Sequence, residues 1–145
     1  MIQRIQTVYL LLAIVLLAVT NFVPLLSFQT PAGEIVDLST FSGNGISFLT
    51  IGTSVASVLL CIISIFMYKS RKKQILVSYL ALIPILLLLG YFIGYSYGLV
   101  HSQANNQFVA VKGIILPIVS IVFILLAIRK IKADEKLVRS LDRIR

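Results

Sequence analysis

Charge is scarce in this chain of 145 residues, and it is almost missing from the apolar stretches. Charged residues make up 12% of the sequence, whereas hydrophobic residues make up 59%. Ionisable side chains inside a membrane are costly, and they usually mark proton relays, ion paths or substrate sites. The shortage of such side chains argues against an ion-coupled pump or transporter.

The apolar stretches themselves predict helices that cross a membrane. Each is about 20 residues long, which lets a helix traverse a hydrocarbon core of ~30 Å. Apart from Lys112, they contain no aspartate, glutamate, lysine, arginine or histidine. They leave no room for a separate folded domain, so we expect one all-α integral membrane domain over residues 1–145, with transmembrane helices running up, down, up and down. The four expected spans are residues 8–28, 46–68, 75–95 and 109–128.

Cysteine is nearly absent. The only one, Cys61, lies deep in the second apolar stretch. One cysteine forms neither an internal disulfide nor a thiol pair, which excludes the four-helix thiol oxidases that need paired cysteines. We expect Cys61 to be a small buried packing residue. One histidine and scattered carboxylates make no ligand cluster, so no metal and no other cofactor is expected.

One string has the letters of a catalytic motif. Gly94-Tyr-Ser-Tyr-Gly98 matches G-x-S-x-G, and His101 follows three residues later. In hydrolases this motif forms a strand-to-helix turn that exposes the serine beside an oxyanion hole. Here the string lies at the end of an expected membrane helix, so Ser96 is not expected to be a nucleophile and the chain is not expected to be an enzyme.

The net charge of +8 is concentrated at one side of the expected membrane domain. Arg4 precedes the first span, four cations lie in residues 69–73, and seven lie in residues 129–145 against three acidic residues. Lysine and arginine favour the cytoplasmic side of a membrane protein. Both termini and the 69–73 connection are therefore expected in the cytoplasm.

Small residues recur at helical spacing in the second and third spans. Helix faces of this kind let two backbones approach closely in a membrane, so we expect the two spans to pack through them. Pro24, Pro84 and Pro117 each fall inside an expected span and predict a kink there. The residues expected at the helix-packing faces are Gly52, Ala56, Gly90, Gly94 and Gly98.

The tail, residues 129–145, is the one region whose sequence pattern suggests that it binds another molecule. It contains no glycine or proline, so the last span is expected to continue into the cytoplasm as a basic amphipathic helix. Its apolar stripe and its cations suit a protein partner, anionic lipid or ribosomal RNA, and a simple solvated tail is the further alternative. The residues expected to dock are Lys136, Leu137, Arg139, Leu141, Arg143, Ile144 and Arg145.

Both ends of the chain resemble a known family. The opening Met1-Ile-Gln-Arg-Ile-Gln-Thr-Val-Tyr-Leu-Leu-Leu12 and the ending Asp134-Glu-Lys-Leu-Val-Arg-Ser-Leu-Asp-Arg-Ile-Arg145 are similar to those of a bacterial four-span family, domain of unknown function 4293. The resemblance covers essentially the whole chain. It implies a four-helix protein of the inner membrane, and it implies no activity and no catalytic residue.

These observations predict a non-enzymatic accessory or scaffolding subunit of a larger inner-membrane assembly. Its expected partners are membrane lipids and other protein subunits, with no small-molecule substrate evident. Protein secretion and envelope biogenesis are candidate processes by analogy alone. The alternative is an uncoupled transporter of a small molecule or lipid, as a homodimer. A coupled exporter of the small multidrug type is disfavoured because the first span has no carboxylate.

Overall fold

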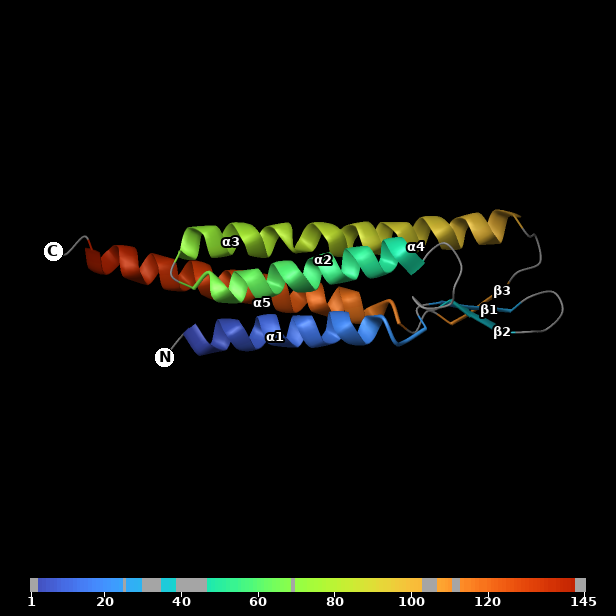
Figure 1. The fold of residues 1–145 in the computed structure, drawn as a ribbon, viewed down its shortest axis with the longest axis horizontal. Helices are drawn as coiled ribbons and strands as arrows, with labels where there is room; N and C mark the ends of the chain where they lie inside the picture. The colour runs from blue at the N-terminus through green and yellow to red at the C-terminus, as the bar shows by residue number, and fades with distance from the viewer. Residues whose placement is uncertain are drawn as a thin grey trace.

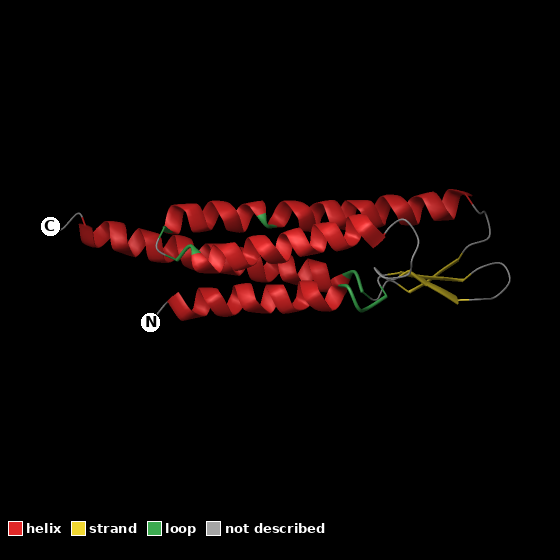
Figure 2. Cartoon of the chain, in the orientation of Figure 1, coloured by secondary structure: helices red, strands yellow, loops and turns green. Residues whose placement is uncertain are grey.

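The computed structural model describes residues 3–24, 26–29, 35–38, 47–68, 70–102, 107–110 and 113–142. Helices dominate, and three short strands gather at one end (Figures 1 and 2). The helices are α1 (Gln3–Thr20), α2 (Ser47–Phe66), α3 (Arg71–Leu80), α4 (Leu82–Ser102) and α5 (Ile115–Asp142), and the strands are β1 (Leu26–Gln29), β2 (Ile35–Leu38) and β3 (Gln107–Ala110).

The helices form a four-rod bundle, because α3 and α4 follow each other as one rod (Figure 1). Both α1 and the α3–α4 rod pack against α2 and α5. Successive rods run in opposite directions, so both chain ends and the α2–α3 connection lie at one end of the bundle, and the strands lie at the other. This end of the bundle, with both termini, is called the basic end below.

Each rod buries one seam of residues spaced alternately by three and four. On α1 the seam is Gln6, Leu10, Ala13, Leu17 and Thr20, all at most 5% exposed. This spacing keeps one face turned toward the neighbouring helices, as in left-handed bundles with small crossing angles. Leu10, Leu17, Ile85 and Ile124 meet in the centre of the bundle around Cys61. The corresponding seam on α5 includes Pro117, Ser120, Ile124, Ala127, Ile131 and Asp134.

The strands are the main departure from the expected all-helical fold. The sheet order is β2-β1-β3, with β1 antiparallel to both neighbours. Phe28 pairs with Val36 on one side and with Phe108 on the other. The expected spans 8–28 and 109–128 are therefore not helical at the ends nearest the sheet. Residues 26–28 belong to β1 and residues 109–110 to β3, so α1 and α5 are shorter there than predicted.

The prolines explain where the helices stop and break. α1 ends at Thr20, four residues before Pro24, and the rod breaks at Ala81, between Leu80 and Pro84. A proline cannot donate to the carbonyl four residues earlier, and its ring crowds that carbonyl. Pro117 instead lies in the first turn of α5, where a missing N–H costs nothing. Of the three prolines expected to kink a span, only Pro84 lies in the interior of a rod, where the α3–α4 break occurs.

Two helical stretches are long and apolar enough to cross a membrane, judged by length and composition. They are Phe48–Phe66 and Arg71–Gly98, and within each an apolar segment of 18 residues is only 28% buried inside the chain. The apolar part of α1, Ile5–Thr20, is shorter. The outer faces remain apolar on every rod, as Val15, Leu59, Leu87 and Val122 show with exposures of 56%, 53%, 61% and 51%.

The glycines do not pack as the sequence predicted. Gly52, Gly90, Gly94 and Gly98 are exposed, and a Cβ placed on any of them would meet no atom within 4 Å. The α2 helix does contact α4, but it turns a different face inward. That face consists of small polar residues and one thiol: Thr50, Ser54, Ser57, Cys61 and Ser64. Ala56, half-buried, lies beside it.

Candidate functional site at the basic end of the bundle

A buried polar contact joins the two ends of the chain. The side-chain amide of Gln6 on α1 donates a hydrogen bond to Oδ2 of Asp134 on α5. Both side chains are buried, with exposures of 5% and 7%. Arg71, the first residue of α3, donates from its guanidinium to the main-chain oxygen of Asp134 at 2.8 Å. Three separate rods therefore meet at Asp134.

A second buried polar cluster lies between α2 and α3 near the same end. The hydroxyls of Ser64 and Ser78 lie 2.7 Å apart, and both residues are fully buried. Ser64 also donates to the main-chain oxygen of Gln74 at 3.4 Å. Because each buried hydroxyl has a partner, these residues tie α2 to α3 without the cost of an unsatisfied polar group.

Hydroxyls also link α1 to α2 near the strands. Ser54 donates to the side-chain oxygen of Asn21 at 2.9 Å, and Asn21 in turn donates to the carbonyl of Leu17 at 3.0 Å. Ser57 donates to the carbonyl of Thr53 at 3.0 Å within its own helix. The side chains of the α2 seam are small, and small side chains such as serine and threonine let neighbouring helices approach closely in membrane bundles.

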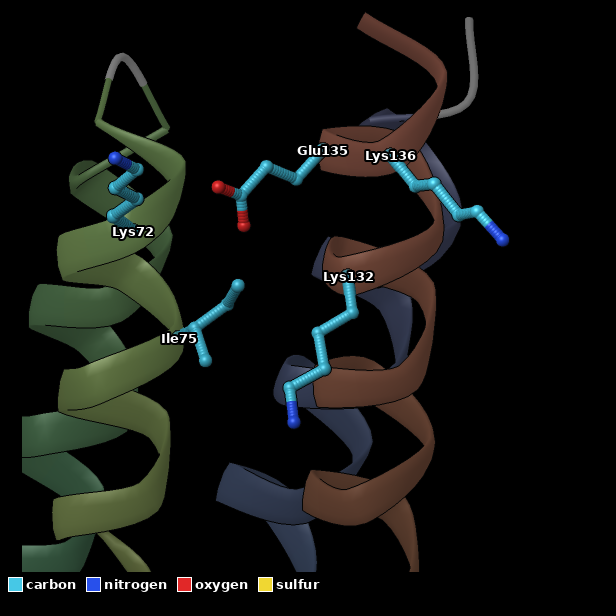
Figure 3. A pocket seen from close by; sticks show the side chains of 5 residues that line it. All are labelled: Lys72, Ile75, Lys132, Glu135 and Lys136. Carbon is cyan, nitrogen blue, oxygen red and sulfur yellow. The ribbon is translucent and has the colours of Figure 1, made fainter. Parts of the chain in front are cut away.

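The basic end carries an open pocket between α3 and α5 (Figure 3). Its volume is about 480 Å³, and its walls are Lys72 and Ile75 on α3 and Lys132, Glu135 and Lys136 on α5. The Glu135 carboxylate extends toward α3, whereas Lys136 extends away from it. Lys72 and Lys132 outnumber the single acid, Glu135, so cationic side chains predominate in the pocket.

Lys132 is held in place by an aromatic residue of α3. Its Nζ donates to the hydroxyl of Tyr79 at 2.8 Å and lies 5.0 Å from the centre of the Tyr79 ring. Lys132 also lines a second pocket of about 380 Å³ with Tyr79. The two pockets therefore share Lys132, and both are lined by residues of α3 and α5.

The α5 helix continues beyond the basic ends of its neighbours (Figure 1). Leu137 and Val138 are 56% and 41% exposed there, and Lys136 is also exposed. Of the residues expected to dock, Lys136 and Leu137 thus have exposed side chains. Arg139 and Leu141 belong to α5, but their side chains lie outside the description, as do residues 143–145 entirely.

The catalytic string is an ordinary piece of helix. Ser96 lies inside α4, and its hydroxyl donates to the carbonyl of Ile93 at 2.8 Å. The strand-to-helix turn of a hydrolase is therefore not present at this position. Among the described residues, no three histidine, cysteine or acidic side chains are grouped as a metal site would require. Cys61 is buried, as predicted.

The residues that join the rods were not predicted from the sequence. Gln6, Arg71 and Asp134 were treated only as parts of motifs or as contributors to charge, and Ser64 and Ser78 were not singled out. A signal was present, because Gln6, Asp134 and the α2 hydroxyls all fall on the alternating three-and-four spacing of the buried seams. Reading that spacing through polar residues as well as apolar ones would have found them.

The fold is a helical bundle with membrane-length helices, an apolar surface and a polar, basic end. A family model described as Domain of unknown function (DUF4293) matches residues 2–144, so the chain belongs to this family. No curated protein matches the chain, and no solved structure matches it. The resemblance of the two terminal motifs is thereby confirmed.

Proposed function

We propose that this protein is a non-enzymatic accessory or scaffolding subunit of a larger assembly in the bacterial inner membrane. In this proposal all four rods cross the membrane, and both termini face the cytoplasm. The basic end, with its protruding α5, is the docking surface for a protein partner.

The observation that carries the proposal is the uncovered end of α5. Leu137 and Val138 are exposed beyond the bundle, next to the exposed cation Lys136. A helix that projects past its own bundle gains nothing from burial inside the chain. Apolar side chains at such a place favour a docked partner, because an amphipathic helix docks by laying its apolar face into a hydrophobic groove of another protein.

The membrane placement is supported by the surface of the rods. A soluble bundle buries one stripe of each helix and covers the remaining surface with polar residues. Here the outward residues of all rods include leucine, isoleucine and valine at exposures near one half. The lysines and arginines of the 69–73 connection and of the α5 end gather at one end of the bundle, which supports a cytoplasmic location for that end.

A transporter of polar small molecules would require a polar path between rods. The pocket between α2 and α4 has a volume of about 400 Å³, but its lining is dominated by leucines. Its few polar groups include the hydroxyls of Thr50 and Thr53, and Thr53 is already bonded to its own helix through the carbonyl of Leu49 at 2.8 Å. This lining favours a packed subunit over a passage for polar solutes.

The test is a truncation that respects the packing of α5. Ile131 and Asp134 are buried against the bundle, so a chain ending at Lys130 would lose internal contacts as well as the docking surface. A chain ending after Glu135 keeps them. Affinity purification from cells in mild detergent, with the tag inserted at residues 103–106, would compare this chain with the full chain.

The full chain is expected to recover a stoichiometric partner, and the chain ending after Glu135 is expected to lose it. Both are expected to stay in the membrane fraction after carbonate extraction. The matched variant is Leu137→Glu with Val138→Glu, which leaves the chain length unchanged and should also lose the partner. Equal recovery of the partner by all three chains would overturn the proposal.

A further inference from the structure

The groove between α3 and α5 changes character along its length. At the basic end it is lined by Lys72, Lys132 and Lys136 with one acid, Glu135. Toward the middle of the bundle it is lined by Val122, Leu125 and Leu126. Lys132 lines both pockets, so the charged one and the more apolar one are neighbours between α3 and α5. A phospholipid has this same order of charged and apolar parts.

Cations line one side of α5 along this groove. Arg129, Lys132 and Lys136 recur at intervals of three and four, which places them on one face of the helix. Arg129 and Lys132 line the apolar part of the groove together with Tyr79. The hydroxyl and ring of Tyr79 hold the Lys132 ammonium near the boundary between the two parts.

The opposite wall adds a helix N-terminus. α3 begins at Arg71, and its N-cap residue Ser70 makes no side-chain capping hydrogen bond. Its first turn contains no acidic residue, so the positive end of the helix dipole is not offset from within the helix. Lys72, in that first turn, lines the pocket, which therefore lies beside the positive end of α3 and has side-chain cations on both walls.

We propose that this groove binds one anionic phospholipid. Its phosphate lies between Lys72 and Lys132, and one acyl chain lies along Val122 and Leu125. Basic pockets between membrane helices at the cytoplasmic side favour anionic headgroups. The inference rests on the membrane placement given above, but it is independent of any protein partner, since the groove opens along the bundle below the protruding α5 end.

The test uses native mass spectrometry of the full chain released from nanodiscs that contain equal amounts of phosphatidylglycerol and phosphatidylcholine. The wild-type chain is expected to retain one phosphatidylglycerol. The Lys72→Gln, Lys132→Gln double variant is expected to retain it at least tenfold less, because it loses two headgroup cations. Phosphatidylcholine retention is expected to be low for both chains.

The matched control is the Lys73→Gln, Lys130→Gln double variant, which removes the same charge from the same two helices. Neither Lys73 nor Lys130 lines the groove, and both are exposed. This control is expected to retain phosphatidylglycerol like the wild type. An equal loss in both double variants would show nonspecific attraction and would overturn the proposal, as would equal retention of the two lipids by the wild type.

Membrane extraction of the same variants separates this inference from the proposed function. If all chains insert but none prefers phosphatidylglycerol, the lipid site is contradicted and the membrane placement stands. If the wild-type chain does not insert at all, both are contradicted. A bulky replacement inside the apolar part, Leu125→Trp, is expected to lower lipid retention without altering the cations.

Discussion

Gln6 donates a hydrogen bond from its side-chain amide to the carboxylate of Asp134, across 128 positions of sequence. The two residues belong to the two terminal motifs that resemble the family, one at each end of the chain. Their contact is buried, and Arg71 adds a bond to the main chain of Asp134. The two terminal motifs therefore contact each other at the basic end of the bundle, through α1 and α5.

Replacing Asp134 by alanine is expected to destabilise the chain by about 1–3 kcal/mol, because the buried amide of Gln6 loses its acceptor. The Gln6→Ala variant is expected to lose a similar amount, and the double variant less than the sum. Thermal unfolding in detergent, followed by circular dichroism, measures all three. Strict additivity of the two single changes would contradict a direct contact.

The buried hydroxyl seam of α2 is expected to reject large side chains. Ser57 is fully buried, so Ser57→Leu overpacks the bundle and should cost about 1–3 kcal/mol. Gly52 lies on the same helix with open space around it, so Gly52→Leu should cost little. Unfolding midpoints in detergent compare the two changes. If Gly52→Leu were the more harmful, α2 would pack through its glycine face and not through its hydroxyls.

The glycines of α4 are expected to tolerate alanine within the isolated chain. A glycine inside a helix is less favourable than alanine by about 0.5–1 kcal/mol, and the space around Gly94 accommodates a methyl group. The Gly94→Ala variant should therefore unfold at a higher temperature in detergent. Lower stability would show that Gly94 makes a close contact. A loss of partner recovery in cells would place the predicted glycine packing between chains.

The general architecture follows directly from the sequence, but its ends do not. Apolar length predicted membrane-length helices, and two stretches meet that criterion. The strands were missed because Leu26-Ser-Phe-Gln29 and Gln107-Phe-Val-Ala110 extend apolar runs, and apolar length alone does not separate a short strand from a helix end. Pairing of these distant segments with one another, which the chain order does not reveal, decides between the two.

The site was only partly predictable for a related reason. Charge patterning drew attention to the end of α5, where Lys136 and Leu137 are exposed. It grouped Asp134 with the tail, although Asp134 is buried. The local sequence shows which residues are charged. How deeply each charged side chain of α5 is buried depends on how far α1 and α3 extend beside it.

The proposed orientation predicts which residues are accessible from each side of the membrane. Cys61 is fully buried, so a Cys61→Ser chain provides a background for single cysteines. In intact spheroplasts a membrane-impermeant maleimide is expected to label the Gln29→Cys variant, at the strand end. It is expected to label the Lys73→Cys and Ser140→Cys variants only after lysis. The reverse pattern would place the termini outside.

The most direct test of the docking surface is photo-crosslinking in living cells. A photoreactive amino acid at Leu137 is expected to give one discrete adduct with a larger protein, because this exposed side chain lies on the proposed docking surface. The same group at Lys73, which is exposed at the same end but lies outside α5, is expected to give no such adduct. An absence of adducts at Leu137, or the same adducts at both positions, would contradict the proposal that the end of α5 docks a partner.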